Sequence, residues 1–131
     1  MIIGDLQRKK HLKLGRFGED TAVKLLKQKN YTILARNFRL KSGELDIVAL
    51  DGCEIVFVEV KTIRHHNNFT PAGNLSFRQL KRNHITGKLY LAIFGIAHAR
   101  CRYDLIEITV DRRRRRKILN ITHSTDILTL K

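Results

Sequence analysis

The sequence predicts an α/β domain in which helices cover both faces of a central sheet. Residues 43–62, GELDIVALDGCEIVFVEVKT, have the pattern of a hairpin whose two strands are apolar on both faces. A sheet buried on both sides needs helices packed against it. Helical patterns precede and follow this hairpin, and the length of 131 residues suits one domain with a single core.

The amino-terminal residues 1–14 are basic and polar, without the apolar core or cleavage site of a secretory signal. We therefore expect a flexible lead-in, followed by one domain over residues 15–131. Cys53 and Cys101 stand in apolar runs without CxxC spacing, which favours reduced core thiols in the cytoplasm. No segment has the roughly 18 apolar residues of a membrane-spanning helix, so no membrane association is expected.

The first helix is predicted within residues 15–31, GRFGEDTAVKLLKQKNY. Glu19 shares one helical face with three apolar residues, Ala22, Val23 and Leu26. Its carboxylate then points toward the core side of the helix. The alternative is a first-turn glutamate that lies at the rim and is favoured by the helix dipole.

Residues 31–40, YTILARNFRL, are rich in β-branched and aromatic side chains and predict the first strand. In the hairpin that follows, Asp51 and Gly52 have the composition of a tight two-residue turn, which requires positive φ angles. With these two residues at the turn, Leu50 faces Cys53. This choice fixes the register of the whole hairpin.

The polar residues 63–74, which include the only proline, predict a surface loop. A helix is expected from Ser76, whose distance to Gln79 is that of a capping box. Gly87 weakens the expectation that this helix continues unbroken. Its apolar stripe comprises Leu80, Ile85, Leu89, Ala92 and Ile93.

Two further strands are predicted, over residues 101–110 and 117–123. Between them lies DRRRRRK, residues 111–117, in which neighbouring arginines repel one another and favour a solvated hairpin tip. This tip is either a soluble loop or a loop that binds phosphate groups. In the second case the phosphate groups would be bound by Arg112, Arg113 and Arg114.

Net charge gives the strongest indication of a binding partner. The chain has 26 Lys and Arg against 12 Asp and Glu, a formal charge of +14. Because each neutralised phosphate releases counterions, nucleic acid is the expected partner, and salt should weaken the binding steeply. The alternatives are a membrane-surface protein and a basic protein without such a partner.

Three charged residues are expected on one face of the hairpin. Alternation places Glu59 and Lys61 on the same side, and the register puts Asp46 there too, opposite Phe57 and roughly 7 to 8 Å from Glu59 along the diagonal. The other face carries apolar side chains, Leu45, Ile47, Ala49, Val56, Val58 and Val60. Buried charges must pair or hold a cation. Lys61 could neutralise one carboxylate, whereas a divalent ion such as Mg²⁺ would neutralise both.

In this order, GRFGED, NFR, GELDIV and VFVEVKT resemble the UPF0102 or YraN-like family. Members of this family look like PD-(D/E)XK nucleases and archaeal Holliday-junction resolvases. The resemblance spans about residues 15 to 110 and implies a restriction-endonuclease-like fold, a mixed central sheet flanked by helices. It also implies a metal-dependent endonuclease acting on DNA, with structured or branched DNA in repair or recombination as the expected substrate.

The resemblance assigns catalytic roles to particular residues. Asp46 and Glu59 would bind Mg²⁺ or Mn²⁺, and Lys61 would assist the attacking water. Glu19 would complete the site. The backbone carbonyl of Val60 is an additional metal ligand in such enzymes.

The resemblance also suggests residues for nucleic-acid binding. Gln79 matches a polar position beside the site, and Arg78 stands where relatives carry lysine. Basic residues that flank the acidic motifs are either phosphate contacts or ordinary surface charge: Arg16, Arg39, Lys41 and Arg64. A non-catalytic nucleic-acid-binding module on the same fold remains the alternative function. A homodimer is a further expectation, since the resolvases that this family resembles act as dimers with two cutting sites.

Overall fold

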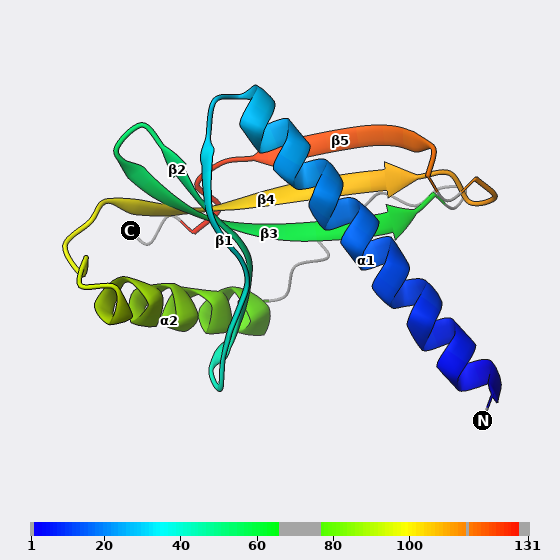
Figure 1. Ribbon diagram of the computed structural model, residues 1–131, viewed down its shortest axis with the longest axis horizontal. Coiled ribbons are helices and arrows are strands. Elements are labelled where there is room, and N and C mark those ends of the chain that lie inside the picture. Colours follow the sequence, from blue (N-terminus) through cyan, green and yellow to red (C-terminus); the bar gives the residue numbers. More distant parts are fainter. Residues whose placement is uncertain (1, 66–76, 115, 129–131) are drawn as a thin grey trace.

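The protein consists of a five-stranded sheet between two helices (Figure 1). The computed structural model describes the backbone of residues 2–65, 77–114 and 116–128, and the side chains of residues 14–65, 78–114 and 116–128. The two helices pack on separate apolar clusters of the sheet. The predicted α/β class is confirmed, and the arrangement is compatible with a restriction-endonuclease-like fold.

The strands follow one another across the sheet in the order β1-β2-β3-β4-β5. Only β3 and β4 are parallel, so the sheet is mixed, and α2 lies in the crossover that joins these two strands. The elements are α1 (Ile2–Gln28), β1 (Thr32–Leu40), β2 (Gly43–Asp51), β3 (Glu54–Arg64), α2 (Phe77–Ile93), β4 (Cys101–Val110) and β5 (Ile118–Ser124).

Helix α1 begins at Ile2, so residues expected in a lead-in are helical. A left-handed residue follows the end of each helix, Asn30 with φ 69° and Gly95 with φ 70°. The amide of the next residue donates a hydrogen bond to a carbonyl in the last turn of the helix in each case. The expected helix start at Ser76 and its capping box lie outside the described residues. Neither described helix combines the length and hydropathy needed to cross a membrane.

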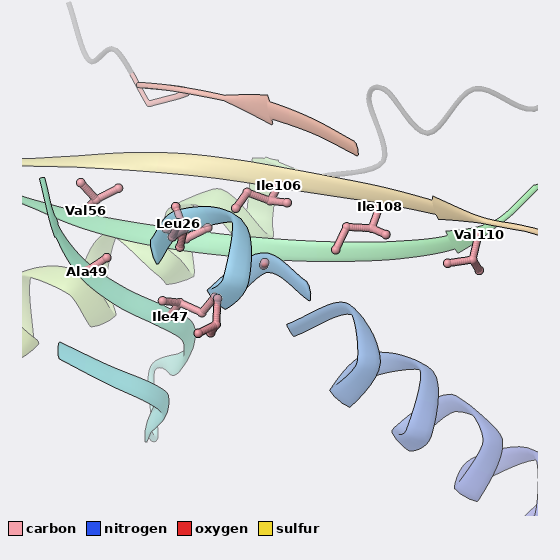
Figure 2. Close-up of a cluster of buried hydrophobic side chains, with 10 residues drawn as sticks. Leu26, Ile47, Ala49, Val56, Ile106, Ile108 and Val110 are labelled. Carbon is pink, nitrogen blue, oxygen red and sulfur yellow. The ribbon is translucent and has the colours of Figure 1, made fainter. Parts of the chain in front are cut away.

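Helix α1 packs on the sheet through the predicted residues Ala22, Val23 and Leu26, which are buried. They contact aliphatic side chains of β2, β3 and β4 (Figure 2). Just before them, Gly18 lies so close to β3 that a Cβ there would come 1.7 Å from Thr62 Oγ1. The glycine therefore allows α1 to touch β3 and places the next residue, Glu19, at the edge of this contact.

Helix α2 packs on the other face through Tyr90 and Leu91, and it is continuous through Gly87. A Cβ at Gly87 would come 2.4 Å from the Tyr103 hydroxyl and 3.0 Å from the Phe57 ring, so only glycine permits this approach. The predicted apolar stripe does not form the core. Its members Ile85, Leu89 and Ile93 are exposed, because the face that meets the sheet carries the smaller Gly87 and the site residues.

The predicted hairpin is present, but the predicted register differs from the observed one by two residues. Asp51 pairs with Glu54, so the turn consists of Gly52 and Cys53. Gly52 has φ 62°, and a glycine at the first central position is what a type II′ turn uses. Cys53 and Cys101 are free, but Cys53 is exposed at this turn and is not a core thiol.

A shift of two residues keeps every side chain on its predicted face except near Asp46. Leu45 packs with the α2-side cluster, although alternation predicted the opposite face. The cause lies in the neighbouring strand, where Asn37 adopts a left-handed φ of 54° between the pairs Arg36 to Ile47 and Phe38 to Leu45. This residue breaks the alternation of β1 and β2 beside Asp46.

A buried ion network joins the strands at the other end of the sheet. Arg102 donates hydrogen bonds to Asp51, Glu54 and Asp104, at 3.0, 2.8 and 3.1 Å. Asp104 also lies 2.8 Å from His123 Nε2. Burial alone would raise the pKa of Asp104, but the hydrogen bonds from His123 and Arg102 outweigh it and lower that pKa. The network thus ties the β2–β3 hairpin to β4 and β5.

Candidate active site

Asp46 and Glu59 lie together where β2 separates from β3. The ladder between these strands ends at the pair Ile47 and Val58. One residue further, the Asp46 side chain replaces a backbone partner, and its Oδ2 accepts the amide of Val60 at 2.8 Å. The Asp46 and Glu59 side chains line the same cavity and are close enough to influence each other's pKa. The two acids therefore share one face, as alternation predicted, and are direct neighbours instead of a diagonal pair.

Burial and mutual repulsion change the protonation of this acid pair. Burial, followed by repulsion from Glu59, raises the pKa of Asp46 to about 7. The pKa of Glu59 is also raised, mainly by burial, although Lys61 and Asn83 favour its charged form. Two adjacent carboxyls that resist ionising together share a proton or are neutralised by a cation.

Polar side chains from α2 and β3 surround Glu59. Gln79 Nε2 donates to Glu59 Oε1 at 2.7 Å, and Asn83 Nδ2 donates to Glu59 Oε2 at 3.2 Å. Lys61 Nζ lies 3.6 Å from Glu59 Oε1 and donates to Gln79 Oε1 at 3.2 Å. The first turns of α2 therefore hold the carboxylate and the ammonium group in fixed relative positions.

Glu19 approaches Asp46 from the α1 side of the sheet. Its Oε1 accepts hydrogen bonds from Arg36 Nε at 2.9 Å and from Asn37 Nδ2 at 3.0 Å. These contacts hold Glu19 at the margin of the acid pair. Among the described residues, no three His, Cys, Asp or Glu side chains form a group that could hold a metal ion.

Two cavities meet at Asp46. The α2-side cavity, of about 360 Å³, also contains Glu59. The α1-side cavity, of about 420 Å³, is also lined by Glu19 and Val60. Basic residues predicted to bind nucleic acid line both: Arg78 on the α2 side, and Arg16 and Arg39 on the α1 side. The acid pair is thus reachable from two sides.

Other predicted phosphate contacts do not line these two cavities. Lys41 is exposed in the β1–β2 turn, and Arg64 ends β3. Arg39, which does line the α1-side cavity, is paired with Glu44 at 3.3 Å. The three loop arginines predicted to bind phosphate are exposed: Arg112, Arg113 and Arg114. The roles of all these residues stay predictions.

Sequence reasoning missed two polar residues of the site. Asn83 bonds to Glu59 and lies one helical turn after Gln79, a spacing that would have indicated it. Glu107 is buried and pairs in register with Lys61 across the parallel strands, so both side chains project from the same face. No signal in the sequence links Glu107 to the acidic motifs, because its position beside Lys61 depends on the pairing of β3 with β4.

Comparison with known proteins agrees with the resemblance. The family model described as uncharacterised protein family UPF0102 matches residues 18–108. A UPF0102 protein of Symbiobacterium thermophilum is 40% identical over 73% of this chain and 81% of its own length. One from Moorella thermoacetica is 40% identical over 77% of this chain and 84% of its own, and one from Clostridium botulinum (strain Hall) is 39% identical over 75% and 80%. The chain belongs to the UPF0102 family.

Proposed function

We propose that this protein is a metal-dependent endonuclease that hydrolyses phosphodiester bonds of DNA. The observation that supports this most strongly is the adjacent pair of acids, Asp46 and Glu59, which line one cavity, with the Lys61 ammonium group 3.6 Å from Glu59. Two acids and a lysine on one face, open to cavities lined by arginines, suit an anionic phosphate substrate.

The residues present fit a hard divalent cation. Asp46 and Glu59 offer carboxylate oxygens, the ligands that Mg²⁺ and Mn²⁺ prefer, and the backbone carbonyl of Val60 would be a further oxygen ligand. Burial and repulsion raise the pKa of both acids, so a cation would relieve an unfavourable pairing of charges. Glu19 would act from the margin, through the water shell of the ion, because Arg36 and Asn37 hold its Oε1.

A divalent cation held there would polarise the phosphate and lower the pKa of a bound water. The chain's own groups supply orientation and charge. Lys61, held between Glu59 and Gln79, would orient the attacking water and offset negative charge that develops on the phosphate oxygens. Arg78 and Arg16, one in each cavity, would position the backbone of the substrate without selecting its sequence.

Cleavage of labelled duplex, branched and single-stranded DNA, with Mg²⁺, Mn²⁺ or EDTA, tests this proposal. We expect cleavage that requires the ion, that is lost in Asp46→Asn and Glu59→Gln, and that falls about 100- to 1,000-fold in Lys61→Ala. DNA binding should survive in Asp46→Asn, because a repulsion between carboxylate and phosphate is removed. The matched control is Asp51→Asn, an aspartate of the same strand at the distant hairpin turn, which should cleave normally.

One observation favours a second candidate, a non-catalytic DNA-binding module. The Lys61–Glu59 pair could neutralise the site internally, and within the described ranges the acids form a pair and not a group of three. Such a module would bind DNA in all variants and cleave in none. Loss of cleavage confined to the acid pair and Lys61 would exclude it.

The same proposal includes a location and an assembly state. The two cysteines are free, which suits a reducing cytoplasm. A symmetric cut of branched DNA would require two copies of the site, so a homodimer is the state we propose for such substrates. Light scattering with and without junction DNA would detect it.

A further inference from the structure

A row of arginines continues from the acid pair along the α1 face of the protein. Arg16 lines the α1-side cavity together with Asp46. It also lines a second surface cavity, of about 320 Å³, together with Arg116, Phe17 and Asp20. Arg16 therefore lies between the acid pair and the β4–β5 loop, and Figure 1 shows that loop at the end of the sheet toward which the amino-terminal part of α1 points.

The β4–β5 loop holds its arginines in a defined arrangement. Asp111 Oδ1 accepts the amides of Arg113 and Arg114 at 2.8 and 2.9 Å. The Asp111 amide donates to the carbonyl of Lys117 at 2.8 Å, which closes the loop. The described arginine side chains of the loop are exposed. The loop is thus a closed turn that presents several guanidinium groups to solvent.

Among the described arginines, some are neutralised by acidic partners and others, including those near the loop, form no ion pair. Arg36, Arg39 and Arg102 each form ion pairs. Across the described ranges, no ion pair involves Arg16 or Arg116. Unpaired positive charges in a row raise the local potential and attract a polyanion.

The strand register gives the length of this row. Val60, whose amide binds Asp46, pairs with Ile106, and Arg64 pairs with Val110 just before the loop. The interval is four residues, or about 13 Å along the strands. Because the backbone of one B-form DNA strand winds around the helix axis, its successive phosphates are farther apart than the axial spacing of about 3.4 Å, and this interval spans only a few phosphates.

We propose that the surface from Asp46 across Arg16 to Arg116, here named the arginine track, binds the sugar-phosphate backbone of one DNA strand. The proposal rests on the proposed function for its ligand, and it adds the direction of the substrate. The strand leaves the acid pair along α1 and ends its contact at the β4–β5 loop. The loop then sets affinity and the length of DNA required, and it contacts no base.

The test is binding of a fluorescent 20-base-pair duplex in EDTA, so that cleavage plays no part. The variant is Arg16→Ala/Arg116→Ala. The matched control, Lys88→Ala/Arg100→Ala, removes the same charge from exposed positions outside the track. If each arginine contacts one phosphate, the slope of log K against log salt falls by about 1.8 and affinity falls by up to about 60-fold at 0.1 M salt. We expect this loss in the track variant, an almost unchanged slope in the control, and retention of the slope in Arg16→Lys/Arg116→Lys.

Equal losses in the track and control variants would overturn the arginine track, since net charge alone would then explain binding. Metal-dependent cleavage by the unmodified protein is measured separately. Cleavage combined with equal losses of affinity in the two variants would support the nuclease proposal and contradict the arginine track. Absence of cleavage, combined with a loss of affinity confined to the track variant, would support the arginine track and contradict the nuclease proposal.

Discussion

Replacing Gly18 by alanine should separate the close contact of α1 and β3 from ordinary helix propensity. The added Cβ would lie 1.7 Å from Thr62 Oγ1 and 3.0 Å from Thr62 Cβ, so α1 or Thr62 must move. Overpacking of this kind costs about 1 to 3 kcal/mol, and the gain in helix propensity from glycine to alanine offsets up to about 1 kcal/mol. We expect a net loss of about 1 to 2 kcal/mol in the free energy of unfolding.

Gly15 is the matched control, because it lies in the same helix and a Cβ there would meet no atom within 4 Å. Gly15→Ala should stabilise by roughly 0.5 to 1 kcal/mol. Urea unfolding followed by circular dichroism measures both variants, and the two should differ by about 1.5 to 3 kcal/mol at an unchanged m-value. Thr62→Ser should restore part of the loss in Gly18→Ala, since a serine hydroxyl can rotate away.

Equal stability of the two alanine variants would refute this reasoning. The contact at Gly18 would then not determine how α1 sits on β3. The position of Glu19 beside the acid pair, which depends on the same contact, would need another explanation.

Two further predictions concern stability. Asp104→Asn should lower the free energy of unfolding at pH 7 by about 2 to 3 kcal/mol, less than for a completely broken buried pair because Asp51 and Glu54 still contact Arg102. Because the pKa of Asp104 is lowered in the folded state, this stabilisation is present above the ordinary value near 3.8 and is lost as pH falls through the folded pKa. Urea titrations of both proteins from pH 7 down to about 2.5 should therefore show their free energies of unfolding converging. A difference independent of pH would contradict this role of Asp104. Gly87→Ala should destabilise by about 1 to 3 kcal/mol, and Tyr103→Phe in the same chain should recover part of that loss by removing the hydroxyl 2.4 Å away. Additive effects in this double-mutant cycle would show that the contact is not responsible.

The common face of Asp46 and Glu59 was predictable because side-chain alternation in strands is unaffected by a two-residue error in the register. The turn at Asp51 was misplaced, since Gly52 serves as the first residue of its turn and not the second. The resulting error of two residues returns each side chain to the same face. Asp46, Glu59 and Lys61 therefore stayed together, and only the spacing between the two acids changed.

Other features depend on contacts between distant segments and leave no periodic signal. The left-handed Asn37 redirects Leu45, and nothing in the local sequence of β2 indicates this. Helix α2 was expected to bury its most apolar stripe, but Phe57 and Tyr103 select the side with Gly87. Glu107 lies opposite Lys61 only because β3 and β4 are parallel in one particular register. Tertiary packing decides such cases over local pattern.

The most direct test of the account is the binding of Mn²⁺ by the full chain without DNA, measured by electron paramagnetic resonance. If Asp46 and Glu59 together hold the ion, the unmodified protein binds about one Mn²⁺ per chain. Asp46→Asn and Glu59→Gln each weaken that binding at least about tenfold, while Asp51→Asn leaves it unchanged. Binding of equal strength in all four proteins, or no binding in any of them, would contradict the assignment of this pair as the metal site.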